Sequence, residues 1–493
     1  MKDSIRVVLV YPAYPGETAT PDRPPLGLLT VAAPLVEKGI EVVLLDERAE
    51  QGAFDGLLAE ELEKKPVCVG ISSMSGRHIS GALRVSKFVK EQSTVPVVWG
   101  GVHPSLEPDA TIRHELIDII VRDDGEEIFP LLVERLAHDG DLSDIKGIGY
   151  KKDGEVIMNE LADPATMENM PLYPFHLVDL AKYRSREMWT SERNVLPIET
   201  TRGCPFKCSF CTESVRKKKW RELSPERILN DIKEYIRLYH VRSFTFIDDN
   251  LFGNHNRGEK FVELLLQENI DIKWYTNVRS DYMARVSDEF IRKMEQSGCK
   301  MLTFGAESGS PRILEMIHKH ATVEDVLTTN RKLAKTSIIP HFVSIRGFPT
   351  ETREDAVKTM VLNLQLILEN KKAVCSMPFL ITTPGTVIAR QCIEDDISAY
   401  TLEDWARIFD FEKGDRPPWV LDETFAFYHK YKFLQKLIQI SHLSNKPRVY
   451  PRRSFDIVYY IYRIWSLLPY PVLRMGYHTV LRGMHLWFKL GLR

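Results

Sequence analysis

The sequence predicts an α/β protein with two successive parallel-sheet domains and a mainly helical C-terminal region. A chain of 493 residues is too long for one hydrophobic core, so two or three domains are expected. Short apolar runs alternate with helical patterns over residues 1–140 and again over 191–410, which is typical of βαβ units. We therefore expect a flavodoxin- or Rossmann-like domain, a connector over 141–190, a partial TIM-type (β/α)6 barrel, and a helical region over 411–493.

The composition excludes several classes of protein. Hydrophobic residues make up 44% and charged residues 27%, as in ordinary globular proteins. A net charge of -2 gives no support for nucleic-acid binding. No signal peptide and no transmembrane segment are expected, since no uncharged apolar run approaches the length of about 18 residues that a membrane span needs. Seven cysteines, an odd number, fit reduced thiols in a cytoplasmic, low-oxygen setting.

The first domain shows five strand-like runs separated by four helical stretches near 27–38, 54–64, 79–91 and 126–138. The expected strands are Arg6–Val10, Val42–Leu45, Val67–Ile71, Val97–Trp99 and Asp118–Val121. Short connections between them suggest a flavodoxin-like strand order. In such sheets a ligand binds at the carboxyl ends of the strands, at the switch point.

Small residues and serines gather at these predicted strand ends. Glycine lets the backbone approach a large ligand, and serine can bond its polar groups without adding charge. Turn formation alone explains any one of these loops, but several at one edge favour a binding site. The candidates are Ser72, Ser73, Met74, Ser75, Gly100, Gly101, Val102, His103, Gly125 and Glu126.

The connector is expected to begin with a hairpin and to continue as a stiff linker. Lys152-Asp153-Gly154 separates two extended runs, Ile148–Lys151 and Glu155–Asn159, and Asp-Gly is a strong hairpin signal. Prolines at 164, 171 and 174 then disfavour helix.

The second domain opens with three cysteines in eight residues, Cys204, Cys208 and Cys211. Three thiolates on one short loop can hold three corners of an iron–sulfur cluster, which normally takes four ligands. An iron left with an open position can bind a reactive molecule. A zinc site would need a second pair of ligands, and the other cysteines stand alone in the sequence.

Six strand–helix units are expected to form the open barrel, with its chemistry at the carboxyl ends of the strands. A helix should begin at Ser224-Pro225, and others near 256–268, 287–297, 323–335 and 353–369. The expected strands are Leu196–Thr200, Ser243–Ile247, Ile272–Thr276, Met301–Gly305, His341–Ile345 and Ala373–Phe379.

Polar residues follow several of these strands. Glu307, flanked by Gly and Ser, suits a ribose diol. Asp248 and Asp249 could bond a polar ligand or cap the next helix. Arg346-Gly347 and Thr383–Thr386 stand in turns rich in Gly and Pro, which are common at strand ends.

The cysteine loop, with aromatic Phe210 before its last cysteine, resembles that of the radical S-adenosylmethionine (SAM) enzymes. Residues 1–140 resemble the cobalamin-binding domain found in front of many such enzymes, through Gly-Ile-Ser-Ser-Met-Ser and Gly-Gly-Val-His-Pro. The better-known cobalamin pattern D-x-H-x-x-G is absent, since His103 follows Gly101 rather than an aspartate. The resemblance therefore implies cobalamin without a protein histidine on cobalt, and His103 could equally be a loop histidine that bonds backbone.

The resemblance also implies the cofactors and their sites. Cys204, Cys208 and Cys211 would hold a [4Fe-4S] cluster, and the small residues of the first domain would hold cobalamin. Glu307 would bind the SAM ribose, Phe210 and the strand end Ile345–Gly347 would bracket the adenine, and Ser308 and Arg346 would lie near SAM.

The implied reaction is methyl transfer to an unactivated carbon, through a 5′-deoxyadenosyl radical and methylcobalamin. A radical reaction without methylation, as in the anaerobic oxidative cyclase of bacteriochlorophyll synthesis, is the alternative, and a cobalamin or redox sensor is a third. A small-molecule or lipid-like substrate and an electron donor such as flavodoxin or ferredoxin are the implied partners.

Two basic stretches each have more than one possible role. The run Arg216–Arg221 could be a solvated face, could balance cofactor charge or could attract an anionic substrate. The basic and aromatic tail from Lys446 to Arg493 could pack over the barrel or lie on an anionic membrane surface.

Overall fold

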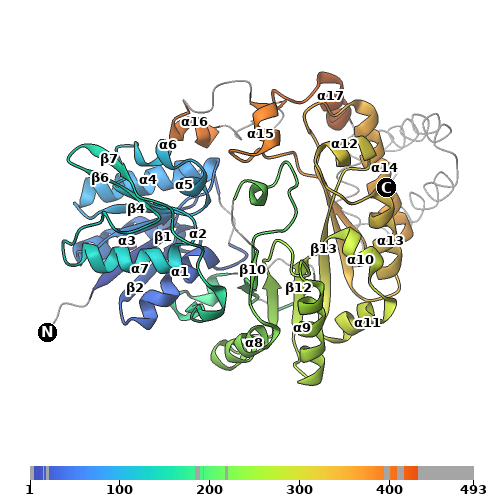
Figure 1. Cartoon of the computed structure of the whole chain (residues 1–493), viewed down its shortest axis with the longest axis horizontal. Coiled ribbons are helices and arrows are strands. Elements are labelled where there is room, and N and C mark those ends of the chain that lie inside the picture. Colours follow the sequence, from blue (N-terminus) through green and yellow to red (C-terminus); the bar gives the residue numbers. More distant parts are fainter. Residues whose placement is uncertain are drawn as a thin grey trace.

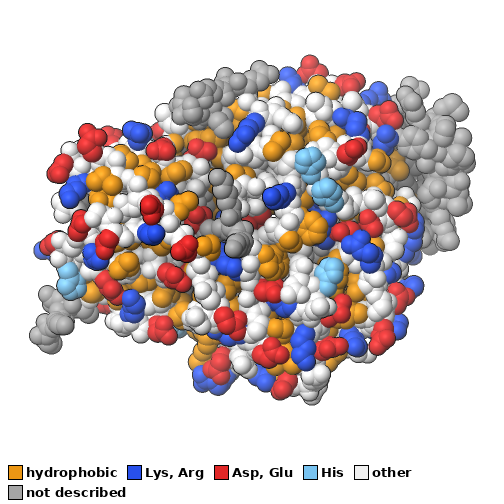
Figure 2. Space-filling view, in the orientation of Figure 1, with side chains coloured by type: hydrophobic (Ala, Val, Ile, Leu, Met, Phe, Trp, Pro, Cys, Tyr) orange, Lys and Arg blue, Asp and Glu red, His pale blue; other side chains and the backbone are white. Residues whose placement is uncertain are grey.

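A computed structural model describes residues 5–14, 16–17, 21–183, 189–192, 194–216, 220–393, 400–407 and 416–430 of the chain. The tail from Lys446 onwards and residues 217–219 of the basic run lie outside the described residues. Figure 1 shows the first domain on the left and the second on the right, with the chain crossing between them more than once. On the face in Figure 2 acidic and basic side chains are interspersed, in keeping with the small net charge.

The first sheet has the predicted flavodoxin-like order. Its parallel strands run β2-β1-β3-β4-β5. Alternate residues of β1 enter different cores: Val7 and Leu9 pack with the helices α1 and α7, and Val8 and Val10 with α3 and α4. The strands are β1 (Arg6–Tyr11), β2 (Glu41–Asp46), β3 (Val69–Ser72), β4 (Val97–Gly100) and β5 (Ile119–Val121). The main helices are α1 (Leu26–Glu37), α3 (Phe54–Glu63), α4 (Arg77–Gln92) and α7 (Gly125–Leu136).

The predicted hairpin forms, but it belongs to the first sheet rather than to a separate connector. Strand β6 (Ile148–Lys152) pairs antiparallel with β5 and with β7 (Glu155–Met158). Asp153 and Gly154 both take positive φ, 52° and 82°, as the tight hairpin turn requires. The reason is burial: the pairing covers the open edge of β5 and places Ile148 and Tyr150 in the same core as α7.

The connector after this hairpin bonds to both domains. Tyr173 and Phe175 pack against Tyr235 of the barrel, and the Tyr235 hydroxyl accepts from the Tyr173 amide at 3.0 Å. The Tyr183 hydroxyl donates to Asp46 at the end of β2, at 3.1 Å. These bonds hold the two domains face to face.

The second domain is the predicted open barrel of six parallel strands. Their order is β15-β14-β13-β12-β11-β8, and β8 and β15 do not pair with each other. The strands are β8 (Leu196–Ile198), β11 (Ser243–Phe246), β12 (Lys273–Asn277), β13 (Cys299–Glu307), β14 (Ile339–Ser344) and β15 (Val374–Ser376). The outer helices include α8 (Pro225–Tyr239), α9 (His255–Gln267), α11 (Asp288–Gln296), α13 (Val323–Leu333) and α14 (Arg353–Glu369).

Helix starts follow the capping residues in the sequence. Ser224 caps α8 as predicted, since its hydroxyl accepts from the Arg227 amide and Pro225 occupies the first turn. Thr322 and Thr352 each form a capping box with an aspartate three residues later.

Three short helices after the barrel were not predicted individually. They are α15 (Val387–Cys392), α16 (Leu402–Arg407) and α17 (Asp422–Lys430). Helix α16 returns to the first domain, where Trp405 is buried in the core beside α4, and α17 packs on the barrel against α14 (Figure 1). In the part of the chain that the structure describes, no helix has the length and apolar character needed to cross a membrane.

Candidate functional site

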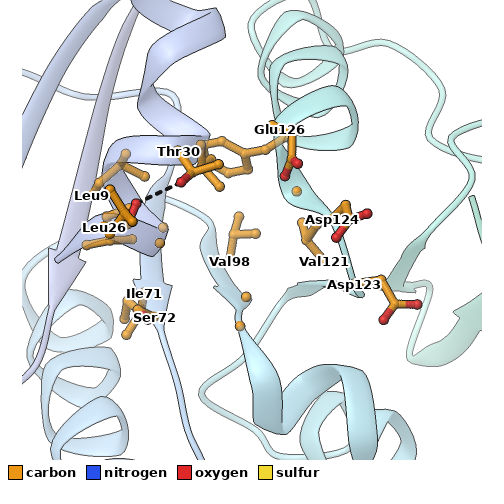
Figure 3. A pocket seen from close by; sticks show the side chains of 18 of the residues that line it. Leu9, Leu26, Thr30, Ile71, Ser72, Val98, Val121, Asp123, Asp124 and Glu126 are labelled. Carbon is orange, nitrogen blue, oxygen red and sulfur yellow. Dashed lines mark hydrogen bonds between the residues drawn. The ribbon is translucent and has the colours of Figure 1, made fainter. Parts of the chain in front are cut away.

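A cavity of about 260 Å³ lies where the first sheet meets the barrel. Figure 3 shows its sheet side, with Ile71, Ser72 and Val121 at the ends of their strands, Val98 within β4, and the Thr30 hydroxyl donating to the Leu26 carbonyl. Glu199, Arg202, Arg216 and Ile247 close it from the barrel. The cavity is therefore shared between the two domains.

Half of the predicted cobalamin residues line this cavity. They are Ser72, Gly100, Gly101, Gly125 and Glu126. Ser73, Met74, Ser75, Val102 and His103 are not among its lining residues. Gly101 has a φ of +107°, and a Cβ there would lie 2.7 Å from the Ser73 carbonyl oxygen, so only glycine lets the β3 and β4 loops approach this closely. The apolar floor with glycine walls fits a large, flat group such as a corrin.

His103 is buried on the short helix α5 (Val102–Leu106) rather than in a loop. Its Nδ1 shares a hydrogen bond of 3.0 Å with the Ser75 hydroxyl, and its ring meets Trp405 edge-on with centroids 6.0 Å apart. Burial lowers the pKa of His103 to about 4, so the ring is neutral. The hydrogen-bond partner of the His103 ring is therefore a side-chain hydroxyl. The alternative prediction for His103 was a hydrogen bond to the backbone.

The cysteine loop leaves the barrel at the end of β8. Strand β9 (Thr201–Arg202) enters it and pairs antiparallel with β10 (Arg221–Glu222), which leaves it. The Asp248 carboxylate accepts bonds from the Thr200 amide at 2.6 Å, the Thr200 hydroxyl at 2.5 Å and the Thr201 amide at 2.9 Å. Asp248 therefore fixes the start of the loop and does not cap the next helix, which Asn254 caps.

The three loop cysteines are free thiols held by backbone contacts on both sides. The Ser209 amide donates to the Ile317 carbonyl at 3.0 Å, and the Ser209 carbonyl accepts from Ile388 at 3.2 Å. Burial raises the pKa of the Cys204 thiol and raises that of Cys211 to about 12. Metal binding would deprotonate them.

The donor set consists of three free thiols on one loop, the kind of ligand that holds the irons of an iron–sulfur cluster. Among the described residues no three His, Cys, Asp or Glu side chains converge tightly enough to hold one metal ion. The ligands of a [4Fe-4S] cluster need not converge on one point, because each cysteine binds a different iron and the three thiols stand apart around the cluster.

Glu307 ends β13 in the left-handed conformation, with a φ of +56°. Its carboxylate is buried and accepts from the Lys319 ammonium at 2.7 Å. A Cβ on Gly305 would lie 2.1 Å from the Glu307 Oε1 atom, so the glycine makes room for the carboxylate. Ser308 points the other way, and its hydroxyl bonds Thr359 of α14 at 3.0 Å. Lys319 was missed because no sequence spacing links it to Glu307.

The turn after β14 holds the last predicted SAM residues. The Arg346 guanidinium lies 3.8 Å above the Phe379 ring, and the Gly347 amide donates to Glu351 at 2.6 Å. The loop and this turn also meet directly, since Phe210 packs edge-on against Phe348 at 5.9 Å.

Two residues that the prediction did not single out support this turn. The Tyr428 hydroxyl donates to the Glu351 carboxylate at 2.9 Å, and the Trp419 indole donates to the Gly347 carbonyl at 2.9 Å. Both come from the C-terminal segment, and no sequence pattern indicates where that segment packs.

Asp249 follows β11 beside the cysteine loop and is exposed. Desolvation by the surrounding protein raises its pKa to about 7, Glu213 adds to the rise and Arg216 opposes it. The site thus offers a carboxyl group that changes charge near neutral pH.

Comparison with known proteins agrees with this geometry. Residues 198–362 match the model of the radical SAM superfamily, and residues 15–133 match the B12 binding domain. An uncharacterized methyltransferase of Pyrococcus horikoshii is 30% identical over 379 residues, which cover 76% of this chain and 79% of that protein. The anaerobic magnesium-protoporphyrin IX monomethyl ester cyclase of a Synechocystis strain is 26% identical over 371 residues, covering 72% of each chain.

A solved structure shares the fold over most of the chain. It is the radical SAM methyltransferase TsrM of Kitasatospora setae with cobalamin and a [4Fe-4S] cluster bound, at 18% identity and a TM-score of 0.64, covering 79% of this chain and 78% of that one. At this level of identity the likeness establishes the fold. The two family models and the Pyrococcus relative together show that the chain belongs to the cobalamin-dependent radical SAM enzymes, whose cofactors are a [4Fe-4S] cluster, SAM and cobalamin.

Proposed function

We propose that this enzyme is a methyltransferase that transfers a methyl group to an unactivated carbon of a small molecule. The observation that carries the proposal is the shared cavity, because the cobalamin-binding edge of the sheet and the base of the cysteine loop line the same space. The methyltransferase named among the relatives supports the same reaction.

The residues have separate tasks in this proposal. Cys204, Cys208 and Cys211 hold the cluster, Glu307 and the Arg346-Gly347 turn hold SAM, and the glycine walls at Gly100 and Gly101 hold cobalamin. Together the bound cofactors supply hydrogen abstraction from carbon and a methyl group for transfer. The protein orients the reacting groups and excludes water, and no general base is needed to remove a hydrogen atom.

An electron donor of the flavodoxin or ferredoxin kind is part of the proposal, since cleavage of SAM consumes one electron. A small-molecule substrate is part of the proposal as well. Contact with a membrane through the tail stays a prediction, because the tail lies outside the described residues.

The decisive test is anaerobic reconstitution with iron, sulfide, cobalamin and SAM, followed by assay of 5′-deoxyadenosine. The wild type should cleave SAM, and the triple variant Cys204→Ala, Cys208→Ala, Cys211→Ala should not. Cys375→Ala is the matched control, since this cysteine is buried away from the loop, next to Asn363. SAM cleavage by the triple variant would falsify the assignment of the cluster.

A second candidate is a radical reaction without methylation, and the similarity to the cyclase favours it. SAM with a deuterated methyl group separates the two. Label in the product supports methyl transfer, whereas substrate-dependent deoxyadenosine with unlabelled product supports the cyclase-like reaction. A sensor would form no substrate-dependent deoxyadenosine.

A further inference from the structure

Two arginines stand at the base of the cysteine loop, one on each strand that frames it. Arg202 on β9 is paired in register with Arg221 on β10. Between them lies the whole loop that carries the three cysteines. Contacts that hold the Arg202 and Arg221 side chains therefore also hold the two ends of the loop.

Carboxylates of the other domain contact both arginines, and Arg202 also donates to Glu199 of its own domain at 2.7 Å. Arg202 contacts Glu126 and lies 3.4 Å from Asp124, and Arg221 donates to the second oxygen of Asp124 at 2.5 Å. Asp124 and Glu126 open helix α7, which begins at the cobalamin-binding edge of the sheet. The four side chains thus join the loop of one domain to the ligand edge of the other.

The environment makes these contacts strong. The side chains of Arg202, Asp124 and Glu126 are only 10%, 5% and 6% exposed. Removal of one partner from a buried ion pair leaves an uncompensated charge, which is strongly unfavourable. The rigid guanidinium fork adds geometric constraint, and the two carboxylates also lie at the favourable end of the helix dipole.

Other contacts hold the domains together independently of this cluster. The Tyr183 hydroxyl bonds Asp46, and helix α16 packs into the first domain with Glu403 3.2 Å from His114. Loss of the arginine contacts should therefore loosen the loop relative to the sheet edge without separating the domains.

We propose that Arg202, Arg221, Asp124 and Glu126 form an interdomain latch that sets the position of the cysteine loop relative to the cobalamin-binding edge. Arg202 and Glu126 are its positioning residues. Glu126 then acts through Arg202 rather than by direct contact with cobalamin, the role that the family resemblance implies for it. The latch rests on the proposed cofactor assignments but on no particular reaction or substrate.

The test compares Glu126→Gln, Arg202→Gln and the double variant with wild type, all reconstituted with cluster and cobalamin. Arg6→Gln is the control, because Arg6 pairs with Glu41 and Glu61 within the first domain. The two readouts are the magnetic interaction between the reduced cluster and cob(II)alamin in electron paramagnetic resonance, and amide hydrogen exchange in residues 203–216.

Each single latch variant should bind cobalamin within about threefold of wild type. Each should also lose the defined magnetic interaction and exchange the loop amides at least tenfold faster. The double variant should recover part of both signals, because it removes both members of the Arg202–Glu126 pair and leaves neither one buried without the other. If the wild type shows no magnetic interaction, the amide exchange rates of residues 203–216 alone test the proposal. If Arg202→Gln does not fold, Glu126→Gln and Asp124→Asn test the latch from the other domain.

Two outcomes overturn the proposal. One is loop exchange in Glu126→Gln that equals wild type. The other is loss of cobalamin binding in Glu126→Gln but not in Arg202→Gln, which would make Glu126 a direct cobalamin contact. Neither readout needs a substrate, so an enzyme that fails to methylate still tests the latch.

Discussion

At the scale of single residues, functional residues that stand together in one short motif could be predicted from the sequence. Contacts between residues that are distant in the sequence could not. The three cysteines were found because their spacing alone indicates a cluster. Glu307 was found by its neighbours Gly and Ser. Its partner Lys319 was not, because the contact depends on how the chain returns after α12 (Pro311–Met316).

The Glu307–Lys319 pair yields a stability prediction. Lys319→Met should lower the free energy of unfolding of the barrel by about 3 kcal/mol, since it strands a buried carboxylate. Lys335→Met is the control, because Lys335 pairs with Asp288 at the surface and such pairs contribute at most about 1 kcal/mol. Urea unfolding of the three proteins gives both values. Equal losses for the two variants would show that Glu307 does not depend on its lysine.

Glu351 yields a pH prediction. Burial raises its pKa from 4.5 to about 7, while bonds from the Gly347 amide and the Tyr428 hydroxyl oppose the rise. Between these two pH values the unfolded chain releases the proton and the folded chain keeps it. The unfolded state is therefore favoured as pH rises, by at most about 3 kcal/mol in total, and the loss is complete above pH 7.

Glu351→Gln removes this titration. The stability of wild type relative to that variant should fall between pH 5 and pH 8 and stay level from pH 8 to pH 9. Thermal unfolding of both proteins across this range measures the difference, in which the other titrating groups largely cancel. A difference that is constant from pH 5 to pH 8 would contradict the raised pKa.

At the scale of elements, local periodicity predicted the two sheets well. Every strand of both parallel sheets lies within a few residues of its predicted place, because buried parallel strands are continuous apolar runs. The hairpin of β6 and β7 was predicted from Asp153-Gly154. That this hairpin joins the first sheet was not predicted. Pairing with β5 is a long-range choice that depends on which edge is open.

Gly101 yields a prediction about how the strand-end loops fit together. Gly101→Ala should destabilise the first domain by about 2 kcal/mol or more, because its φ of +107° is strained for alanine and the new Cβ would meet the Ser73 carbonyl. Gly56→Ala in α3 has open space and ordinary helix geometry, so it should stabilise by about 0.5 to 1 kcal/mol. Chemical denaturation separates the two signs, and the same sign for both would refute the close approach of the loops.

At the scale of the whole molecule, the relation between the domains could not be predicted. Each domain has its own periodic pattern, but the contacts between them join residues far apart in sequence, such as Arg202 with Glu126 and Arg221 with Asp124. The cavity exists only because these contacts bring two strand-end surfaces together. The candidate cofactor residues could therefore be named from the sequence, but not the space that they share.

Helix α16 carries the last prediction, because it shows the C-terminal segment stabilising the first domain. Trp405 is fully buried among Val85, Trp99 and other core residues beside α4, and its ring packs against His103. Truncation of a buried tryptophan costs about 3 to 5 kcal/mol. The local loss should appear where Trp405 packs and not across the barrel, since a chain of several domains opens in separate units. In Trp405→Ala, amide exchange in α4 should accelerate at least a hundredfold while exchange in α14 stays within about threefold of wild type. Leu161→Ala, at a position 57% exposed, is the control and should change neither helix. Equal acceleration in both helices would mean that α16 supports the molecule as one unit rather than the first domain.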